Sequence, residues 1–185
     1  MLKHSSERYS TMTIALHWLM FVLLAAVYAC IELKGLFPKG SDPREALKAL
    51  HFMLGLTVLV LVLPRLAFRL LGPTPAISPE PPAWQQTSAH VAHLLLYVLM
   101  LFMPLAGWLL LSAAGKPIPF FGLQLPALIA ENKDLAEWLK EIHETVGEIG
   151  YYLIGLHVLA ALYHHYVQRD NTLSHMRPAS KLNRD

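Results

Sequence analysis

Residues 14–31, IALHWLMFVLLAAVYACI, form an apolar run of 18 residues in which His17 is the only strongly polar side chain. A helix needs about 17–25 predominantly apolar residues to cross the hydrocarbon core of a bilayer. Because that core offers no water to backbone N–H and C=O groups, a single segment that crosses it forms an α-helix. The run therefore predicts a transmembrane helix, and the rest of the chain repeats its pattern.

Three further apolar runs cover residues 49–64, 91–111 and 149–163, and each contains a single histidine and no Asp or Glu. The shorter runs reach the length of a span when their flanking Leu, Ala, Val and Tyr residues are included. We therefore predict an all-α fold, an integral membrane four-helix bundle. It forms a single transmembrane domain over residues 1–185, with spans at about 13–33, 48–71, 89–113 and 143–168.

The composition agrees with a membrane protein and excludes several other classes. Of the 185 residues, 55% are hydrophobic and only 15% are charged, whereas soluble domains have about 25% charged residues. A formal net charge of +2 creates no strong positive field, so nucleic acid is not an expected partner. The single cysteine, Cys30, excludes an internal disulfide framework and zinc or iron–sulfur sites built on cysteine.

Basic residues next to the spans indicate the orientation. Arg65, Arg69 and Arg169 adjoin the second and fourth spans on the side of the chain termini, and Lys and Arg favour the cytoplasmic side. The total count of basic residues on the two sides is nearly balanced, so these three carry the argument. They predict that the N-terminus and the C-terminus are both cytoplasmic, which we call the inner side.

The segments between the spans also have a readable character. Residues 72–84 contain five prolines, which predicts a stiff, extended connector. Residues 114–133 are rich in Gly, Pro and Phe, which predicts an apolar loop on the membrane surface. From Asp134 the helical periodicity begins before the fourth span, with four glutamates on one face that we interpret as solvated.

Histidines are the unusual feature of this chain, which has ten, and their depth in the predicted bundle sorts them. His51 and His143 both lie near the outer ends of their helices, and no other histidine falls at that level. His157 follows His143 by 14 residues, which is about 21 Å along a helix and only about 40° short of four full turns. His143 and His157 therefore share one face, with Gly150 between them.

This spacing predicts two haem groups stacked across the bundle. Each iron takes an imidazole from either side, and the absence of a Cys-x-x-Cys-His motif indicates non-covalent haem b rather than haem c. A glycine such as Gly150 would make room for a flat macrocycle. Depth pairs His51 with His143 at the outer haem, and it leaves three partners for His157 at the inner haem: His17, His90 and His93.

Other interpretations of the histidines were weighed. A single intramembrane histidine is often a hydrogen-bonded packing residue, but four in two depth-matched pairs are harder to explain in that way. A zinc or copper site would need three or four ligands at one depth with carboxylate or thiolate help, which the apolar runs lack. We expect His90 and His93 to lie at the membrane interface, and His4 and His175 to be exposed to water.

Several short motifs resemble the bacterial cytochrome b561 family, from about residue 7 to residue 178. The C-terminal motifs are the most specific. The matching segments are Glu7-Arg8-Tyr9-Ser10, Ile14-Ala15-Leu16-His17-Trp18, Pro73-Thr74-Pro75, Ala89-His90-Val91-Ala92-His93, His143-Glu144-Thr145, Gly155-Leu156-His157 and Asp170-Asn171-Thr172-Leu173. The resemblance is strongest to the superoxide-oxidising members, which are di-haem b proteins of the bacterial inner membrane.

The resemblance implies that His17 and His157 bind the inner haem and that His51 and His143 bind the outer one. It further implies oxidation of superoxide to O₂ at the periplasmic side, with the electrons passed to ubiquinone. The alternative is a cytochrome b subunit that links a separate dehydrogenase, as a redox partner protein, to the quinone pool. A third class is a non-redox membrane protein with structural or metal-binding histidines.

Candidate substrate contacts follow from the chemistry of a quinone and of superoxide. A quinone needs polar groups near its carbonyls and an apolar slot for its tail. His164 lies seven residues beyond His157 on nearly the same face, and it is a quinone candidate unless it only snorkels at the interface. Further candidates for the quinone or for haem propionates are Arg8, Tyr9, Arg69 and His165. Outer basic residues that could attract the superoxide anion are Lys34, Lys39, Arg44, Lys48 and Lys116.

Overall fold

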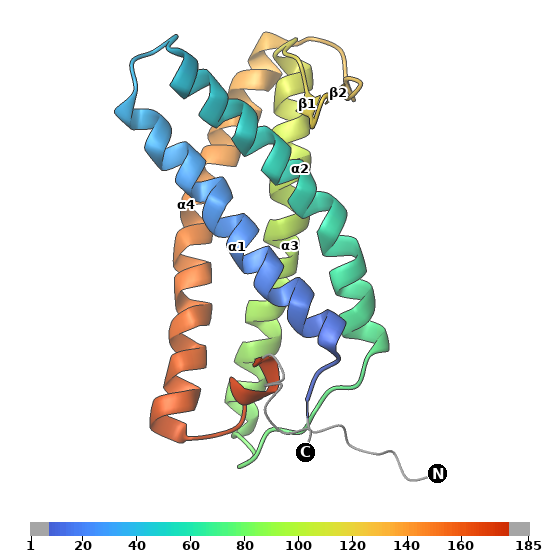
Figure 1. Cartoon of the computed structure of the whole chain (residues 1–185), viewed down its shortest axis with the longest axis vertical. Helices are drawn as coiled ribbons and strands as arrows, with labels where there is room; N and C mark the ends of the chain where they lie inside the picture. The colour runs from blue at the N-terminus through green and yellow to red at the C-terminus, as the bar shows by residue number, and fades with distance from the viewer. Residues whose placement is uncertain (1–7, 178–185) are drawn as a thin grey trace, which may run out of the picture.

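The computed structural model describes residues 8–177, and four long helices dominate this part of the chain (Figure 1). They are α1 (Thr11–Leu33), α2 (Asp42–Leu71), α3 (Ala83–Ala113) and α4 (Lys133–Tyr163). Each is long and apolar enough to cross a membrane. The predicted all-α, four-span membrane fold is therefore confirmed.

The shorter elements lie at the two ends of the bundle. A 3₁₀ turn, η1 (Lys34–Leu36), follows α1, and a two-stranded hairpin of β1 (Pro119–Phe120) and β2 (Leu123–Gln124) lies between α3 and α4. At the other end, a π-helical turn, η2 (His164–Gln168), follows α4, and the chain then forms a 3₁₀ turn, η3 (Ser174–Met176). The described ends of the chain lie together at this end (Figure 1), which we call the inner end after the predicted topology.

Helices α2, α3 and α4 begin six to ten residues before the predicted spans, because hydropathy does not count polar first turns. In α2, Asp42 and Glu45 occupy the first turn and a proline stands at its start, as a helix N-terminus prefers. The early start of α4 agrees with the periodicity seen from Asp134. The proline-rich connector stops at Pro82, which caps α3, two residues earlier than expected.

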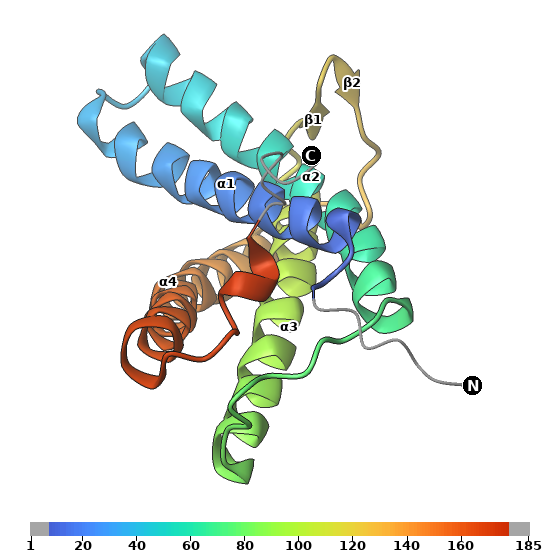
Figure 2. The ribbon, with the colours of Figure 1, turned by 60° about the horizontal axis from the view of Figure 1, so that its bottom comes forward.

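The helices pack in chain order, α1 on α2, α2 on α3 and α3 on α4. Figure 2 shows α1 and α2 as one antiparallel pair and α3 and α4 as the other, with the C-terminal segment folded back beneath them. A core cluster of Met20, Val58, Val62 and Met100 joins the first three helices. Many large apolar side chains face outward, among them Leu71, which is 87% exposed, as expected where lipid surrounds the bundle.

Helices α1 and α4 are joined by a tyrosine at mid-height. The hydroxyl of Tyr28 donates to the carbonyl oxygen of Gly147 at 2.9 Å, and the Tyr28 and Tyr151 ring centroids are 4.2 Å apart. A Cβ on Gly150 would lie 2.2 Å from the Tyr28 hydroxyl oxygen. The prediction that Gly150 makes room for a macrocycle is therefore wrong, because it makes room for Tyr28.

Candidate functional site

Five histidines form two layers inside the bundle. In the outer layer, His51 of α2 faces His143 of α4, with ring centroids 6.2 Å apart and ring planes at 79°. In the inner layer, His17 of α1 faces His157 of α4 at 6.3 Å and 63°. His93 of α3 also approaches His157, at 5.7 Å. The structure thus brings together both pairs that the sequence analysis selected.

The ring spacing suits two imidazoles that bind one metal from opposite sides. A metal–imidazole nitrogen bond is about 2.0 Å long, so two such bonds in line, with the half-width of each ring, place the centroids about 6 Å apart. Among residues 8–177, no group of three or more His, Cys, Asp or Glu side chains could hold a metal ion by itself. Two-imidazole ligation of a haem iron therefore fits the layers better than a zinc or copper centre does.

His51 is oriented as a haem ligand should be. Its Nδ1 lies 3.0 Å from the backbone carbonyl oxygen of Val27, and a carbonyl only accepts, so Nδ1 carries the proton and Nε2 has a free lone pair. One turn further along α2, no atom lies within 4 Å of a Cβ built on Gly55. A flat ring could therefore approach the α2 backbone beside His51.

His143 packs against a glycine that the sequence analysis missed. A Cβ on Gly107 of α3 would lie 3.3 Å from Cε1 of His143, so a larger residue would press on the ring. Nδ1 of His143 is buried without a hydrogen-bond partner among the described residues, as expected where a further group completes the site. A glycine inside a transmembrane run is the signal that could have identified Gly107.

The inner layer contains a charged residue, Arg65, which lies within α2 rather than at the end of its span. Its Nη2 is 3.1 Å from Nδ1 of His17, and its guanidinium lies 5.6 Å from the centroid of the Tyr97 ring. Guanidinium only donates, so binding of iron by Nε2 of His17 requires Arg65 to leave Nδ1. The inner pair fits a haem with this one adjustment, and the rule that a charge inside a span marks a functional site could have flagged Arg65.

The two histidines of α3 behave differently from each other. His93 lies ten residues inside α3 and its ring is beside His157, so the expectation that it is interfacial is wrong. The helix begins six residues earlier than predicted, which moves His93 deeper. His90 is exposed and its Nδ1 lies 2.7 Å from the carbonyl oxygen of Gln86 on the same helix.

A polar cluster closes the inner end. Nδ1 of His164 contacts a carboxylate oxygen of Asp170, whose other oxygen accepts from the backbone N–H of Thr172 at 2.9 Å. Burial would raise the pKa of Asp170, but the hydrogen bonds from His164 and Thr172 hold that pKa below its usual value. The carboxylate therefore stays ionised, because its side chain is 1% exposed but well paired.

His175 belongs to this cluster and is not exposed to water as predicted. It is 5% exposed, because the C-terminal segment folds back over the inner end, and its ring meets Tyr9 edge-on at 6.4 Å. Burial, with a smaller effect of Arg8, lowers the pKa of His175 against the opposing effect of Asp170. His4, also expected to be exposed to water, lies outside the described residues.

The other quinone candidates differ in position. The guanidinium of Arg69 lies 5.7 Å from the Tyr9 ring centroid, and Arg8 is exposed. The ring of His165 packs on Tyr166 at 4.8 Å. The structure therefore brings Tyr9 and Arg69 together at the inner end, with His164 at the end of α4.

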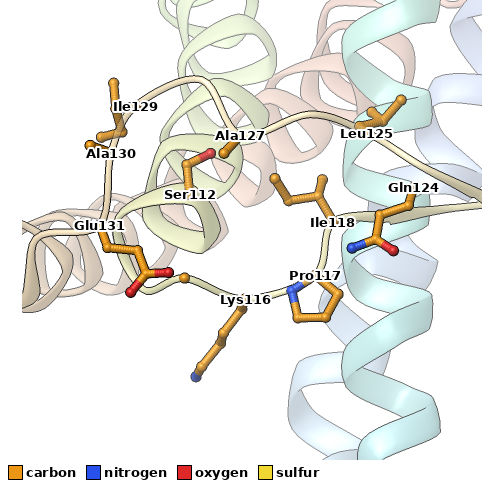
Figure 3. Close-up of a pocket in the computed structure, with 11 residues that line it drawn as sticks. Ser112, Lys116, Pro117, Ile118, Gln124, Leu125, Ala127, Ile129, Ala130 and Glu131 are labelled. Atoms are coloured by element: carbon orange, nitrogen blue, oxygen red, sulfur yellow. The ribbon is translucent and has the colours of Figure 1, made fainter.

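At the outer end, several basic residues already have partners. Arg44 donates to the carbonyl oxygens of Lys34 and Phe37, at 3.1 and 2.8 Å, and Lys48 pairs with Glu45 at 2.7 Å. A pocket of about 460 Å³ lies under the loop after α3 and is lined by Ser112, Lys116 and Glu131, among others, but by none of the candidate histidines (Figure 3). Of the predicted basic residues, Lys39 and Lys116 are exposed.

Comparison with known proteins identifies the family. The model of the prokaryotic cytochrome b561 family matches residues 8–179. Cytochrome b561 homolog 1 of Escherichia coli K12 is 41% identical over 175 residues, covering 95% of this chain and 99% of the relative. The probable superoxide oxidase CybB of Yersinia pestis is 39% identical over 175 residues, covering 95% and 98%. Cytochrome b561 homolog 2 of Escherichia coli K12 is 27% identical over 181 residues, covering 94% and 93%. With two imidazole layers inside four spans, the chain belongs to the prokaryotic cytochrome b561 family of haem b-binding membrane electron-transfer proteins.

Proposed function

We propose that this protein is a di-haem b oxidoreductase of the bacterial inner membrane that oxidises superoxide to O₂ on the periplasmic side and reduces ubiquinone. The observation that carries the proposal is the pair of histidine layers, each with a ring spacing of 6.2 or 6.3 Å and both sharing α4. The 39% identity to a probable superoxide oxidase supports the choice of substrate.

In this proposal, His51 and His143 bind the outer haem, and His17 and His157 bind the inner one. The resemblance to the family favours His17 over His93 as the partner of His157. A bound haem supplies one-electron redox chemistry, and the chain contributes the ligands and the orientation of their rings. His51, held by the Val27 carbonyl, would need no rearrangement.

The two substrates are assigned to opposite ends. Superoxide is an anion, and the exposed Lys39 and Lys116 would raise its local concentration at the outer end. Ubiquinone would bind from the lipid at the inner end, with His164 the first candidate for a carbonyl contact and Tyr9, Arg8 and His165 as further candidates. The exposed apolar surface of α4 offers a path for the quinone tail.

A superoxide assay on the purified chain tests this function against its alternative. Haem-loaded protein should consume superoxide and reduce added ubiquinone without any other protein. If superoxide fails to reduce the haem, the chain is instead an electron-transfer subunit that needs a dehydrogenase. The exposed acidic residues and Trp138 on the first turns of α4 would suit such a partner.

The orientation is part of the proposal, with both termini in the cytoplasm. Arg69 and Arg169 at the inner end still favour this topology, although Arg65 no longer counts because it lies inside α2. A reporter active only in the periplasm, fused after residue 185, should stay silent, whereas the same reporter inserted in the loop between α1 and α2 should be active. The reverse result would exchange the inner and outer ends.

A further inference from the structure

His164 and Asp170 form an ion-pair arrangement that the haem layers do not use. Asp170 is buried at the inner end, and both of its carboxylate oxygens are engaged, one by Nδ1 of His164 and one by the N–H of Thr172. The His164 side chain is 18% exposed. Asp170 holds Nδ1, so Nε2 is the nitrogen available to a ligand or to water.

The backbone is shaped to bring these two residues together. The turn after α4 is π-helical over His164–Gln168, and Arg169 adopts a left-handed conformation with φ of 56°. π-helical turns and left-handed non-glycine residues both cost free energy and concentrate at functional sites. Together they reverse the chain so that Asp170 points back at the ring of His164.

Contacts with three other segments keep this turn in place. The side chain of Asn171 accepts from the N–H of Ser78 in the proline-rich connector at 2.8 Å. The indole N–H of Trp18 on α1 donates to the carbonyl oxygen of Met176 at 2.8 Å. His175 packs against Tyr9. The Asp170 carboxylate is therefore fixed, as a group that orients a neighbouring imidazole must be.

We propose that Asp170 is a positioning residue that holds His164 with Nδ1 protonated, so that Nε2 of His164 delivers a proton to the quinone at the inner end. The inference rests on the proposed function. Reduction of a quinone to a quinol takes two electrons, which two superoxide ions supply, and two protons. The Nε2–H bond of the His164 imidazolium breaks as an O–H bond forms on one quinone oxygen. The imidazole then takes up a proton from water at the inner face, and the second oxygen is protonated from water.

The ionised carboxylate explains why this pair suits proton transfer. Asp170 stays negative because its pKa is held below the usual value, and a negative partner stabilises the imidazolium that forms at each turnover. The other titratable and charged neighbours of the pair at the inner end are His175, Tyr9 and Arg8. His175 is more deeply buried than His164, which leaves His164 as the imidazole with access to water.

The test compares full-length, haem-loaded Asp170→Asn with the native protein, using a short-chain ubiquinone as acceptor. Asparagine has the size of aspartate and can still accept from Thr172, but it carries no charge to stabilise an imidazolium. Reoxidation of the haem by the quinone should slow about 10²-fold, the contribution of a positioned acid, and should acquire a larger solvent isotope effect. Reduction of the haem by superoxide should be unchanged.

Nitrogen-15 NMR of histidine-labelled protein supplies a readout that does not depend on activity. The signals of His164, identified as those lost in His164→Gln, should report a protonated Nδ1 in the native protein and a changed tautomer in Asp170→Asn. Thr172→Val is the matched control, because it keeps the backbone N–H that binds Asp170, and it should preserve both the His164 signals and the quinone rate.

A native His164 tautomer together with a native quinone rate in Asp170→Asn would overturn the proposal, as would equal slowing of both half-reactions. If Asp170→Asn does not accumulate, Asp170→Glu, which keeps the charge, should retain a larger part of the quinone rate than His164→Ala does. A rate no higher than that of His164→Ala would also overturn it. If the native protein is not reduced by superoxide, the proposed function fails, and the NMR comparison still decides whether Asp170 positions His164.

Discussion

Replacing His143 by leucine is expected to remove one of two haem equivalents and to leave a second, low-spin haem in place. Leucine has no lone pair for iron, and His51 alone would leave the outer haem with one axial ligand. His157→Leu should remove the other haem. The ratio of haem to protein and the reduced-minus-oxidised absorption spectrum measure both effects.

Two histidines of α3 provide the controls. His90→Leu should leave both haem equivalents, because His90 is exposed and contacts its own helix. His17→Leu should remove the inner haem, whereas His93→Leu should retain it. Two unchanged haem equivalents in His143→Leu would contradict the ligand assignment, and loss of the inner haem in His93→Leu alone would give the role of His17 to His93.

Substitutions at the two ends are expected to slow different half-reactions. His164→Ala should slow reoxidation of the haem by quinone about 10²-fold, because it removes the proton donor, and should leave reduction by superoxide unchanged. Lys39→Glu should slow only the reduction by superoxide, several-fold at low salt, because it reverses a charge that attracts the anion. Stopped-flow absorbance measures each half-reaction separately.

Salt and a neutral variant sharpen this comparison. The effect of Lys39→Glu should shrink as ionic strength rises, because the Debye length is about 10 Å at 0.1 M, and Lys39→Gln should have a smaller effect. Arg44 is unsuitable for such a test, because it holds the loop after α1 through two backbone carbonyls. Equal slowing of both half-reactions by His164→Ala would mean that both substrates share one site.

Much of this architecture could be predicted from single-chain regularities. The four spans follow from hydropathy, and the depth of a histidine follows from its distance to a helix end at 1.5 Å per residue. These properties belong to one helix at a time, so His51 and His143 could be paired by depth before any contact was known. The structure places their rings 6.2 Å apart.

Contacts between helices were predicted less well, because they depend on where each helix starts, tilts and rotates. His93 was expected at the interface, but six extra residues at the start of α3 place it beside His157. Gly150 was expected to face a cofactor, but the approach of α1 places Tyr28 there. Arg65 contacts His17 only because α1 and α2 lie together in the bundle.

The sequence by itself determined the four spans, the two levels of histidine and the face of α4 that presents His143 and His157, since each depends on local periodicity and hydrophobicity. The tertiary structure alone decided which side chains meet across helices and how the C-terminal segment folds back to bury Asp170 and His175. That return depends on hydrogen bonds between residues far apart in the chain, such as Trp18 with Met176. No helical or strand period encodes such a bond, because its partners become neighbours only when the bundle has formed.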